Sequence, residues 1–387
     1  MAEETRLIRA GAQPAKLART VGPPVQKGST VLLPNAAALY DDDNYLTYGR
    51  QGLAAQTTLA DALATLEGAA DVALYPSGVA ALSGAMLALL KAGDAVQVVD
   101  TIYKPTRRFC DRVLTRFGVE VAYYDPRTPA EALMAQAPAN LRLIVIESPG
   151  SLSMEMQDAP AIAAAARARG VLTLMDNTWG AGWLFKPLDH GVDVSVQALT
   201  KYVGGHSDAF MGSAAAKDPA LARKLADGVL HMGWAVPGDD AYLMLRGLRT
   251  LPLRLARQGR SGLQAAAWLA GHPQVGQVLH PGLPGAPGHE IWKRDFSGAC
   301  GLFAFTLKPA PQAATEAFLD ALTLFGLGFS WGGFESLAIA CDPQLACRQH
   351  GHDYGGALIR LHIGLEDPDD LIADLAQALG AYDRAGG

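Results

Sequence analysis

The stretch Ser195-Val-Gln-Ala-Leu-Thr-Lys201-Tyr-Val-Gly-Gly-His-Ser-Asp208 indicates both the fold and the place of its chemistry. The apolar run 192–199 predicts a short buried strand, bounded by Gly191 and by the glycine pair at 204–205. Lys201 then lies just beyond the carboxyl end of a strand, where open α/β sheets bind ligands. A buried amine there has a lowered pKa and can attack carbonyl groups. The alternative is a solvated lysine in a polar turn.

A carboxylate follows the preceding apolar run in the same way. The run 171–175 predicts another short strand, and Asp176 comes directly after it. An amine and a carboxylate at the ends of neighbouring strands suit pyridoxal 5'-phosphate (PLP). The amine bonds to the aldehyde of PLP, and the carboxylate keeps the pyridine nitrogen protonated so that the ring accepts electrons. Asp176 and Lys201 therefore favour a PLP site.

Further motifs continue this pattern along the chain. In order they are Tyr48-Gly-Arg50, Tyr75-Pro-Ser-Gly78, Tyr103-Lys-Pro-Thr106, Glu147-Ser-Pro149, Asp176-Asn177-Thr178, Thr200-Lys201-Tyr202 with Gly205-His-Ser-Asp208, Ser330-Trp-Gly-Gly-Phe-Glu-Ser336 and Arg360-Leu-His-Ile-Gly-Leu365. Taken together, from about residue 48 to 365, they resemble the Cys/Met-metabolism family of PLP-dependent enzymes, which have PLP fold type I.

This resemblance implies an α/β fold with three parts. Residues 1–52 are expected to form an N-terminal arm that reaches a neighbouring subunit, residues 53–247 a large PLP-binding domain, and residues 248–387 a smaller α+β C-terminal domain. The sequence pattern itself predicts a mostly parallel sheet covered by helices, because short apolar runs alternate with helical stretches between 53 and 247. The predicted strands there are 72–75, 95–99, 119–123, 143–146, 171–175, 192–197 and 212–216, and the helices are 53–66, 78–91, 105–117, 129–136 and 159–168.

Composition limits the possible partners and compartments. The chain has 387 residues, a net charge of −6 and a pI near 5.8, which argues against nucleic acid and anionic membranes as partners. The first ten residues include several charged side chains and lack the apolar core of a secretory signal. No uncharged apolar stretch approaches membrane-spanning length, so we expect a cytoplasmic protein. Its four cysteines form no Cys-x-x-Cys, and His350 and His352 match no metal-binding pattern, so no metal is expected.

The resemblance assigns the cofactor contacts. Ser77, Gly78 and Val79 form a phosphate cup at the start of a helix, where free N–H groups and the helix dipole attract anions. Thr200 adds a hydroxyl, and Tyr48 and Arg50 bind the phosphate of a neighbouring subunit. Ser77 as an ordinary helix cap and Arg50 as a surface arginine are the alternatives.

The remaining implied residues face the reacting atoms. Tyr103 is expected to stack on the pyridine ring and to assist proton transfer, although a core or interface tyrosine is the commoner case. Two positions depart from the family pattern: Ser151 stands where most relatives have Asn, and Ala198 where many have a phosphate-binding Ser. These departures put one contact to the cofactor's phenolic oxygen and one to its phosphate in doubt.

The substrate residues lie in the last third of the chain. Arg360 interrupts an apolar strand, and a buried arginine needs an anion, either a substrate carboxylate or an internal acidic partner. By resemblance, Ser330 and Trp331 border the same carboxylate, and Trp331 favours β-elimination because many relatives that act at Cγ have a smaller residue there.

These residues imply a PLP-dependent carbon–sulfur lyase that converts L-cystathionine to L-homocysteine, pyruvate and ammonia, as in methionine biosynthesis. We expect it to be a homotetramer built as a dimer of dimers. The alternatives are a cysteine or cystine lyase, an enzyme of the same family that acts at Cγ, and a non-catalytic relative. The combined presence of Lys201, Asp176 and Arg360 argues against the last.

Overall fold

The computed structural model describes residues 20–41 and 45–386, and its larger part is built on a seven-stranded sheet. Its strands are β1 (Asp71–Tyr75), β2 (Ala95–Val99), β3 (Glu120–Tyr124), β4 (Leu141–Glu147), β5 (Leu172–Asp176), β6 (Val194–Gln197) and β7 (Gly212–Ala216). Their order in the sheet is β1-β7-β6-β5-β4-β2-β3. Only β7 runs antiparallel to its neighbours, β1 and β6.

Helices cover both faces of this sheet, which explains why its strands are apolar on both sides. In β7, Ala214 and Ala216 belong to one buried cluster, and Ala215 between them belongs to another. The covering helices are α2 (Ala54–Glu67), α3 (Gly78–Leu89), α4 (Lys104–Phe109), α5 (Ala130–Ala135), α6 (Ala159–Arg167), α7 (Pro219–His231) and α8 (Gly238–Leu248). We call this sheet with its helices the large lobe.

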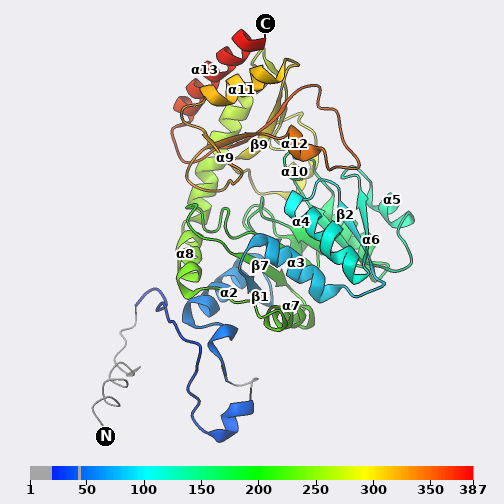
Figure 1. Cartoon of the computed structure of the whole chain (residues 1–387), viewed down its shortest axis with the longest axis vertical. Coiled ribbons are helices and arrows are strands. Elements are labelled where there is room, and N and C mark those ends of the chain that lie inside the picture. Colours follow the sequence, from blue (N-terminus) through cyan, green and yellow to red (C-terminus); the bar gives the residue numbers. More distant parts are fainter. Residues whose placement is uncertain (1–19, 42–44, 387) are drawn as a thin grey trace.

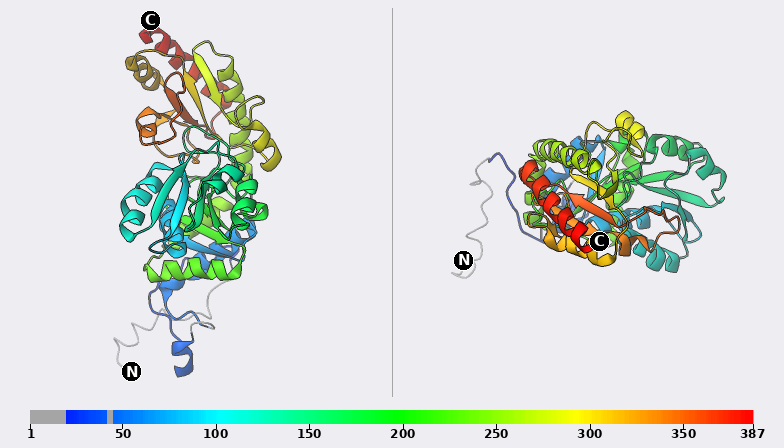
Figure 2. Two further views of the ribbon diagram at one scale, coloured as in Figure 1. Left: turned by 90° about the vertical axis from the view of Figure 1, so that its right-hand side faces the viewer. Right: turned by 90° about the horizontal axis from the view of Figure 1, so that it is seen from above.

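A second, five-stranded sheet forms the core of what we call the small lobe, at the top of Figure 1. Its order is β10-β11-β12-β9-β8, and all neighbours are antiparallel except β10 and β11. The elements are α9 (Leu251–Ala270), β8 (Val275–Leu279), α10 (His289–Asp295), β9 (Leu302–Leu307), α11 (Gln312–Ala321), β10 (Gly326–Leu327), β11 (Leu337–Ala340), α12 (Asp342–Leu345), β12 (Leu358–His362) and α13 (Pro368–Gly386). Figure 2 shows α11 and α13 on the outer side of the small lobe.

The described part of the N-terminal segment contacts the large lobe, where Lys27 pairs with Asp239 of α8 at 2.6 Å, and its middle part projects below that lobe in Figure 1 (see also Figure 2). It contains only short 3-10 turns, η2 (Ala36–Tyr40) and η3 (Gly49–Gln51). Residues 1–19 and 42–44 of the predicted arm lie outside the described residues. Many of its large apolar side chains are exposed, with Val21, Leu32 and Tyr40 at 101%, 89% and 93%.

The predicted fold class is confirmed: a large, mostly parallel α/β sheet accompanies a smaller α+β part. Helix α2 ends at Gly68 in the left-handed conformation, as its sequence indicates. The predicted helix 105–117 is α-helical only over α4. It continues as a π-helix over Cys110–Leu114 and as a 3-10 helix over Thr115–Phe117. The predicted strand 192–197 begins two residues later, at Val194, and ends at Gln197 as predicted; the rest of the apolar run 192–199 belongs to the turn that places Lys201. No helix in the described ranges is long and apolar enough to cross a membrane.

Candidate active site

The carboxyl ends of β4, β5 and β6 bring three ionisable side chains to one edge of the large sheet. Glu147 and Asp176 are the last residues of adjacent parallel strands and are register partners. Lys201 follows the end of β6 by four residues, in a turn that its own N–H closes on Ala198. All three line one cavity between the lobes. The structure thus places Asp176 and Lys201 in the same cavity.

Lys201 is half-buried in this cavity. Its Nζ donates a hydrogen bond of 2.8 Å to Ser330 Oγ and lies 5.5 Å from the centre of the Trp331 ring. Burial, reinforced by the positive charge of Arg360, lowers the pKa of Lys201 to about 8, although Asp176 opposes the shift. About a tenth of the amine is therefore neutral at pH 7, far more than for an ordinary lysine.

The two carboxyl groups are buried side by side. Burial raises the pKa of both, to about 8 for Glu147, whose protonation the nearby Asp176 charge also favours. Asp176 Oδ1 accepts two hydrogen bonds from Thr178, one from its backbone N at 3.0 Å and one from its Oγ1 at 2.5 Å. The site therefore presents a carboxyl whose remaining oxygen is available to a group in the cavity.

Arg360 reaches the same cavity from β12 and is 7% exposed. Its Nη2 donates to the carbonyls of Phe329 at 3.0 Å and Ser330 at 3.1 Å, while its Nε is buried and has no partner in the described ranges. No carboxylate of the described residues forms an ion pair with it. The described residues therefore do not contain the internal acidic partner that the sequence left open. The other alternative, the carboxylate of a bound substrate, is the one that this site can accommodate.

The turn 330–333 brings the small lobe against Lys201. Gly332 has a φ of +83°, and a Cβ on it would lie 2.9 Å from the carbonyl carbon of Lys201, so only glycine fits. Its N–H donates at 3.0 Å to Nε2 of His362, a buried imidazole whose pKa burial lowers to about 3. Trp331 packs edge-on against Tyr202, with ring centres 5.4 Å apart.

The predicted phosphate cup lies at the start of α3. Ser77 Oγ caps the helix by accepting from Ala80 N at 3.1 Å, and Gly78 and Val79 are its first two residues. A Cβ on Gly78 would lie 2.5 Å from Ala198 Cβ, so the cup and the Lys201 turn are closely packed. The Thr200 hydroxyl exchanges hydrogen bonds with the backbone of Met211, at 3.2 Å and 3.0 Å.

Tyr103 lies at the mouth of the cavity, at the start of α4. Its backbone N–H donates to Glu147 Oε2 at 2.8 Å, and its ring is 43% exposed. Burial and the charge of Asp176 raise the pKa of its hydroxyl, while Arg360 opposes the rise. The phenol is therefore protonated near neutral pH.

Two predicted residues lie elsewhere within the single chain. Arg50 is exposed and donates to the Leu230 carbonyl at the end of α7, at 2.9 Å, and Tyr48 is 47% exposed beside it. Neither lines the cavity that holds Lys201. A role for them at this cavity would need a second copy of the chain.

Comparison with known proteins agrees with this arrangement. Residues 4–380 match the family model described as "Cys/Met metabolism PLP-dependent enzyme". The chain belongs to this family. It is 43% identical to the cystathionine beta-lyase MetC of Escherichia coli, over 96% of each chain. It is 38% identical to the L-alanine/L-glutamate racemase of Wolbachia pipientis, over 98% of this chain and 97% of that protein.

Among solved structures, the crystal structure of metB from Corynebacterium glutamicum matches with a TM-score of 0.89 and 30% identity over 98% of each chain. The predicted family, its PLP fold type I and its PLP cofactor are thereby confirmed. The cavity also fits PLP on its own geometry. Of its lining residues, Asp176 offers a carboxyl oxygen and Lys201 an amine of lowered pKa. The start of α3 does not line the cavity, but it adjoins the lining residue Ala198 and offers free N–H groups there.

Sequence reasoning missed two residues that line this cavity, Glu147 and Trp179, and a third, His362, that bonds to the turn 330–333 without lining the cavity. Glu147 was part of a motif but was given no role, although its place at a strand end is the signal that identified Asp176. His362 follows Arg360 by two residues in β12, so alternation along the strand turns both to the same face. Trp179 also lines the cavity, held by its indole N–H on the Leu302 carbonyl at 3.1 Å.

Proposed function

We propose that this protein is a carbon–sulfur lyase that cleaves L-cystathionine by β-elimination to L-homocysteine, pyruvate and ammonia. The observation that carries the proposal is the buried Arg360, which has no acidic partner in the described ranges and shares a cavity with Lys201 and Asp176. The family membership and the 43% identity to a cystathionine beta-lyase support the same reaction.

Lys201 acts as the base and acid of this reaction. Bound PLP supplies a conjugated ring that accepts the electrons left at Cα of the substrate. Lys201 Nζ, neutral in part because its pKa is lowered to about 8, takes the Cα proton. The Cβ–S bond then breaks, and the leaving sulfur takes a proton from Lys201 to give the thiol of homocysteine. Water hydrolyses the three-carbon remainder to pyruvate and ammonia.

Arg360 binds the α-carboxylate of the substrate and so orients Cα toward Lys201. Its free donors suit a two-point contact with a carboxylate. Ser330 holds Lys201 Nζ in place through the 2.8 Å hydrogen bond until the proton moves. Trp331 narrows the cavity beside the carboxylate and favours placement of Cβ over that of Cγ.

The other predicted residues hold the cofactor. Asp176 pairs with the pyridine nitrogen, and Ser77, Gly78, Val79 and Thr200 bind the phosphate. Tyr103 covers the ring and shares in proton transfer. The free N–H groups at the start of α3 and the position of Tyr103 at the cavity mouth support these roles.

The assembly is a homotetramer made of two dimers, in which the arm of residues 1–52 crosses to a neighbour. Tyr48 and Arg50 bind the phosphate of that neighbour's cofactor. The exposed apolar side chains of the arm support this, since Val21, Leu32 and Tyr40 would be covered by a second subunit. We keep domain limits at 52/53, just before α2 begins at Ala54, and at 247/248, one residue before α8 ends; the break between α8 and α9 near Thr250 supports the second.

We place the enzyme in the cytoplasm. Its cysteines are free thiols, and Cys110, Cys300 and Cys341 are buried apart from one another in the two lobes. Reduced thiols are typical of that compartment.

The proposal is tested by product analysis with purified, PLP-loaded enzyme and L-cystathionine. We expect stoichiometric pyruvate, ammonia and homocysteine. Dominant 2-oxobutyrate would replace the proposal with γ-elimination. Racemisation of alanine or glutamate without keto acid would replace it with the activity named for the Wolbachia relative. Pyruvate from cystine but not from cystathionine would point to a cystine lyase.

A further inference from the structure

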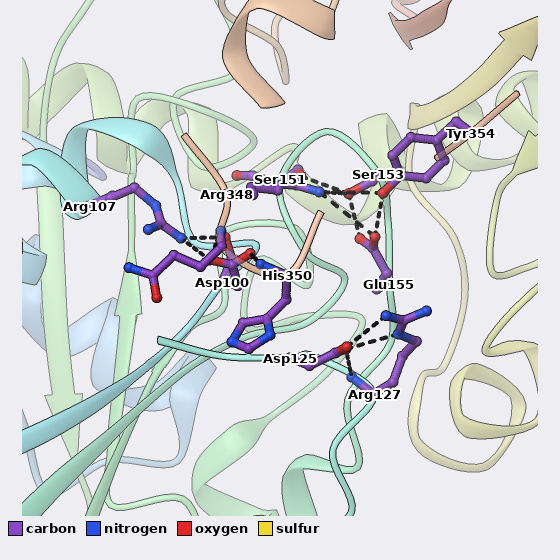
Figure 3. A network of polar contacts seen from close by, with 11 residues as sticks. Asp100, Arg107, Asp125, Arg127, Ser151, Ser153, Glu155, Arg348, His350 and Tyr354 are labelled. Carbon is purple, nitrogen blue, oxygen red and sulfur yellow. Dashed lines mark hydrogen bonds and ion pairs between the residues drawn. The ribbon is translucent and has the colours of Figure 1, made fainter. Parts of the chain in front are cut away.

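Arg348 is a small-lobe side chain that is bound almost entirely by the large lobe. It lies in the loop between α12 and β12, and its side chain is 7% exposed. Its Nη2 donates to the Ser151 carbonyl at 2.5 Å, and its Nη1 donates to Ser153 Oγ at 2.6 Å (Figure 3). Glu155, 3.8 Å away, balances its charge.

The segment that Arg348 grips is a wall of the active-site cavity with an unfavourable backbone. Leu152 and Met154 have φ angles of 69° and 60°, in the left-handed region that residues other than glycine rarely adopt. Both line the cavity, as does Ser151. Such a turn persists only when its surroundings fix it, and Arg348 supplies two of the contacts that do so.

This wall is connected to Tyr103 through buried hydrogen bonds. Ser151 Oγ donates to Glu147 Oε1, and Glu147 Oε2 accepts from the backbone N–H of Tyr103 at 2.8 Å. Ser151 N also donates to the carbonyl of Thr101 at 3.1 Å, two residues before Tyr103. A shift of the wall therefore reaches Tyr103 from two sides.

The residues after Arg348 hold the other end of the same region. The backbone N–H groups of Gln349 and His350 donate to the buried carboxylate of Asp100, at 3.0 Å and 2.8 Å. Asp100 also forms a buried ion pair with Arg107 of α4, the helix that Tyr103 begins (Figure 3). Residues 348–350 thus bind two segments that contact the start of α4: the wall at Ser151 and Ser153, and Asp100.

We propose that Arg348 is a positioning residue for the β-elimination: it fixes the cavity wall 151–154 and, through Ser151 and Glu147, the place of Tyr103. This inference rests on the proposed function for its kinetic part only. Arg348 itself touches no reacting atom. The small lobe thereby contributes Arg348, which fixes this wall, in addition to Arg360 and the turn 330–333.

The test compares three variants of the PLP-loaded enzyme with the wild type. Arg348→Met removes the donors and keeps an unbranched apolar stem, and Arg348→Lys keeps the charge and part of the hydrogen bonding. Arg127→Met is the matched control, because Arg127 lies in the same region but its side chain forms hydrogen bonds, among the described residues, with Asp125 alone (Figure 3). Amide hydrogen exchange is measured for peptides that cover 101–104 and 148–157, together with kcat, KM and cofactor absorbance.

In Arg348→Met we expect faster exchange in both peptides and a fall in kcat of about tenfold or more, since small misplacements of reacting groups are costly. Cofactor content should stay unchanged, Arg348→Lys should recover part of the loss, and Arg127→Met should match the wild type. Wild-type exchange in Arg348→Met, or a kcat within about twofold of wild type, would overturn the proposal. If Arg348→Met does not fold, Arg348→Lys decides by the same criteria.

Exchange needs no substrate. A wild-type enzyme inactive on cystathionine would therefore refute the proposed function, while the exchange data would still decide whether Arg348 holds the wall.

Discussion

Replacing Arg360 with methionine should lower the activity strongly and leave the stability of the fold almost unchanged. Nη2 of Arg360 donates to the carbonyls of Phe329 and Ser330, and Nε, on the same edge of the guanidinium, has no partner in the described ranges, so a carboxylate at this edge accepts from Nε and shares Nη2 with the carbonyls. Two charge-assisted hydrogen bonds at roughly 1.5–3 kcal/mol each amount to about 4 kcal/mol. At about 1.4 kcal/mol for each factor of ten, kcat/KM for cystathionine should fall about 10³-fold.

The stability of the same variant should change little. A buried guanidinium without an acidic partner is costly to the fold, so its removal offsets the loss of its two hydrogen bonds to carbonyls. We expect a Tm within about 3 °C of the wild type. An internal ion pair would behave differently, because breaking it would leave an unpaired buried carboxylate and lower the Tm strongly.

The assay is steady-state kinetics with keto-acid detection, beside thermal unfolding. Arg257→Met is the control, since the Arg257 side chain is 40% exposed and its polar partners in the described ranges are the Glu366 carbonyl and the Asp367 carboxylate. An amine analogue of the substrate without its α-carboxylate should inhibit wild type and Arg360→Met equally well. A loss in kcat/KM under tenfold, or an analogue that discriminates between the two, would refute the role of Arg360.

Other properties follow from the same geometry. Because the pKa of Lys201 is lowered to about 8 and only the neutral amine attacks an aldehyde, covalent uptake of PLP by the cofactor-free protein should accelerate as pH rises and level off above about pH 8; a flat profile from pH 6 to about 9 would contradict this. Burial raises the pKa of Glu67 from 4.5 to about 7, so the fold is most stable relative to this group below pH 4.5 and loses that stability as pH rises to 7. Glu67→Gln should therefore gain up to about 3 kcal/mol of unfolding free energy at pH 8 (2.5 units at about 1.36 kcal/mol) and much less at pH 5, in calorimetry at both values; equal gains would count against a buried charge. Mixing Arg50→Ala with Lys201→Ala chains should restore part of the activity, because one site of each mixed dimer is intact; no recovery despite proven subunit exchange would argue against a shared site. Trp331→Ala should lower kcat/KM for cystathionine by at least about tenfold and raise the 2-oxobutyrate share; unchanged products and rate would remove Trp331 from substrate placement.

The large sheet and the floor of the site are predictable from local sequence. In a parallel sheet the carboxyl ends of all parallel strands lie at one edge. Asp176 and Lys201 follow the carboxyl ends of two such strands, so they are expected at the same edge. The same rule, applied to the strand 143–146, would have brought Glu147 into the site. Helix α7 was not predicted. Its start carries a clear signal, because Asp218 caps it and Pro219 is its first residue.

The contacts between the lobes could not be predicted in this way. Arg348 and Ser151 are far apart in the sequence, and no periodicity links a loop arginine to a carbonyl of a distant turn. The absence of an acidic partner for Arg360 in the described ranges also needed the tertiary structure, because sequence alone left a salt bridge equally possible. For Tyr48 and Arg50, the family resemblance gave a role that one chain by itself does not display.

The central claim is that Lys201 holds PLP in the cavity formed with Asp176 and Arg360. The most direct measurement is borohydride reduction of the PLP-loaded enzyme, followed by digestion and mass spectrometry of the labelled peptide. We predict one cofactor per chain, attached to Lys201, and no covalent label in Lys201→Ala. Stoichiometric attachment to another lysine, such as Lys104 or Lys186, would contradict the account.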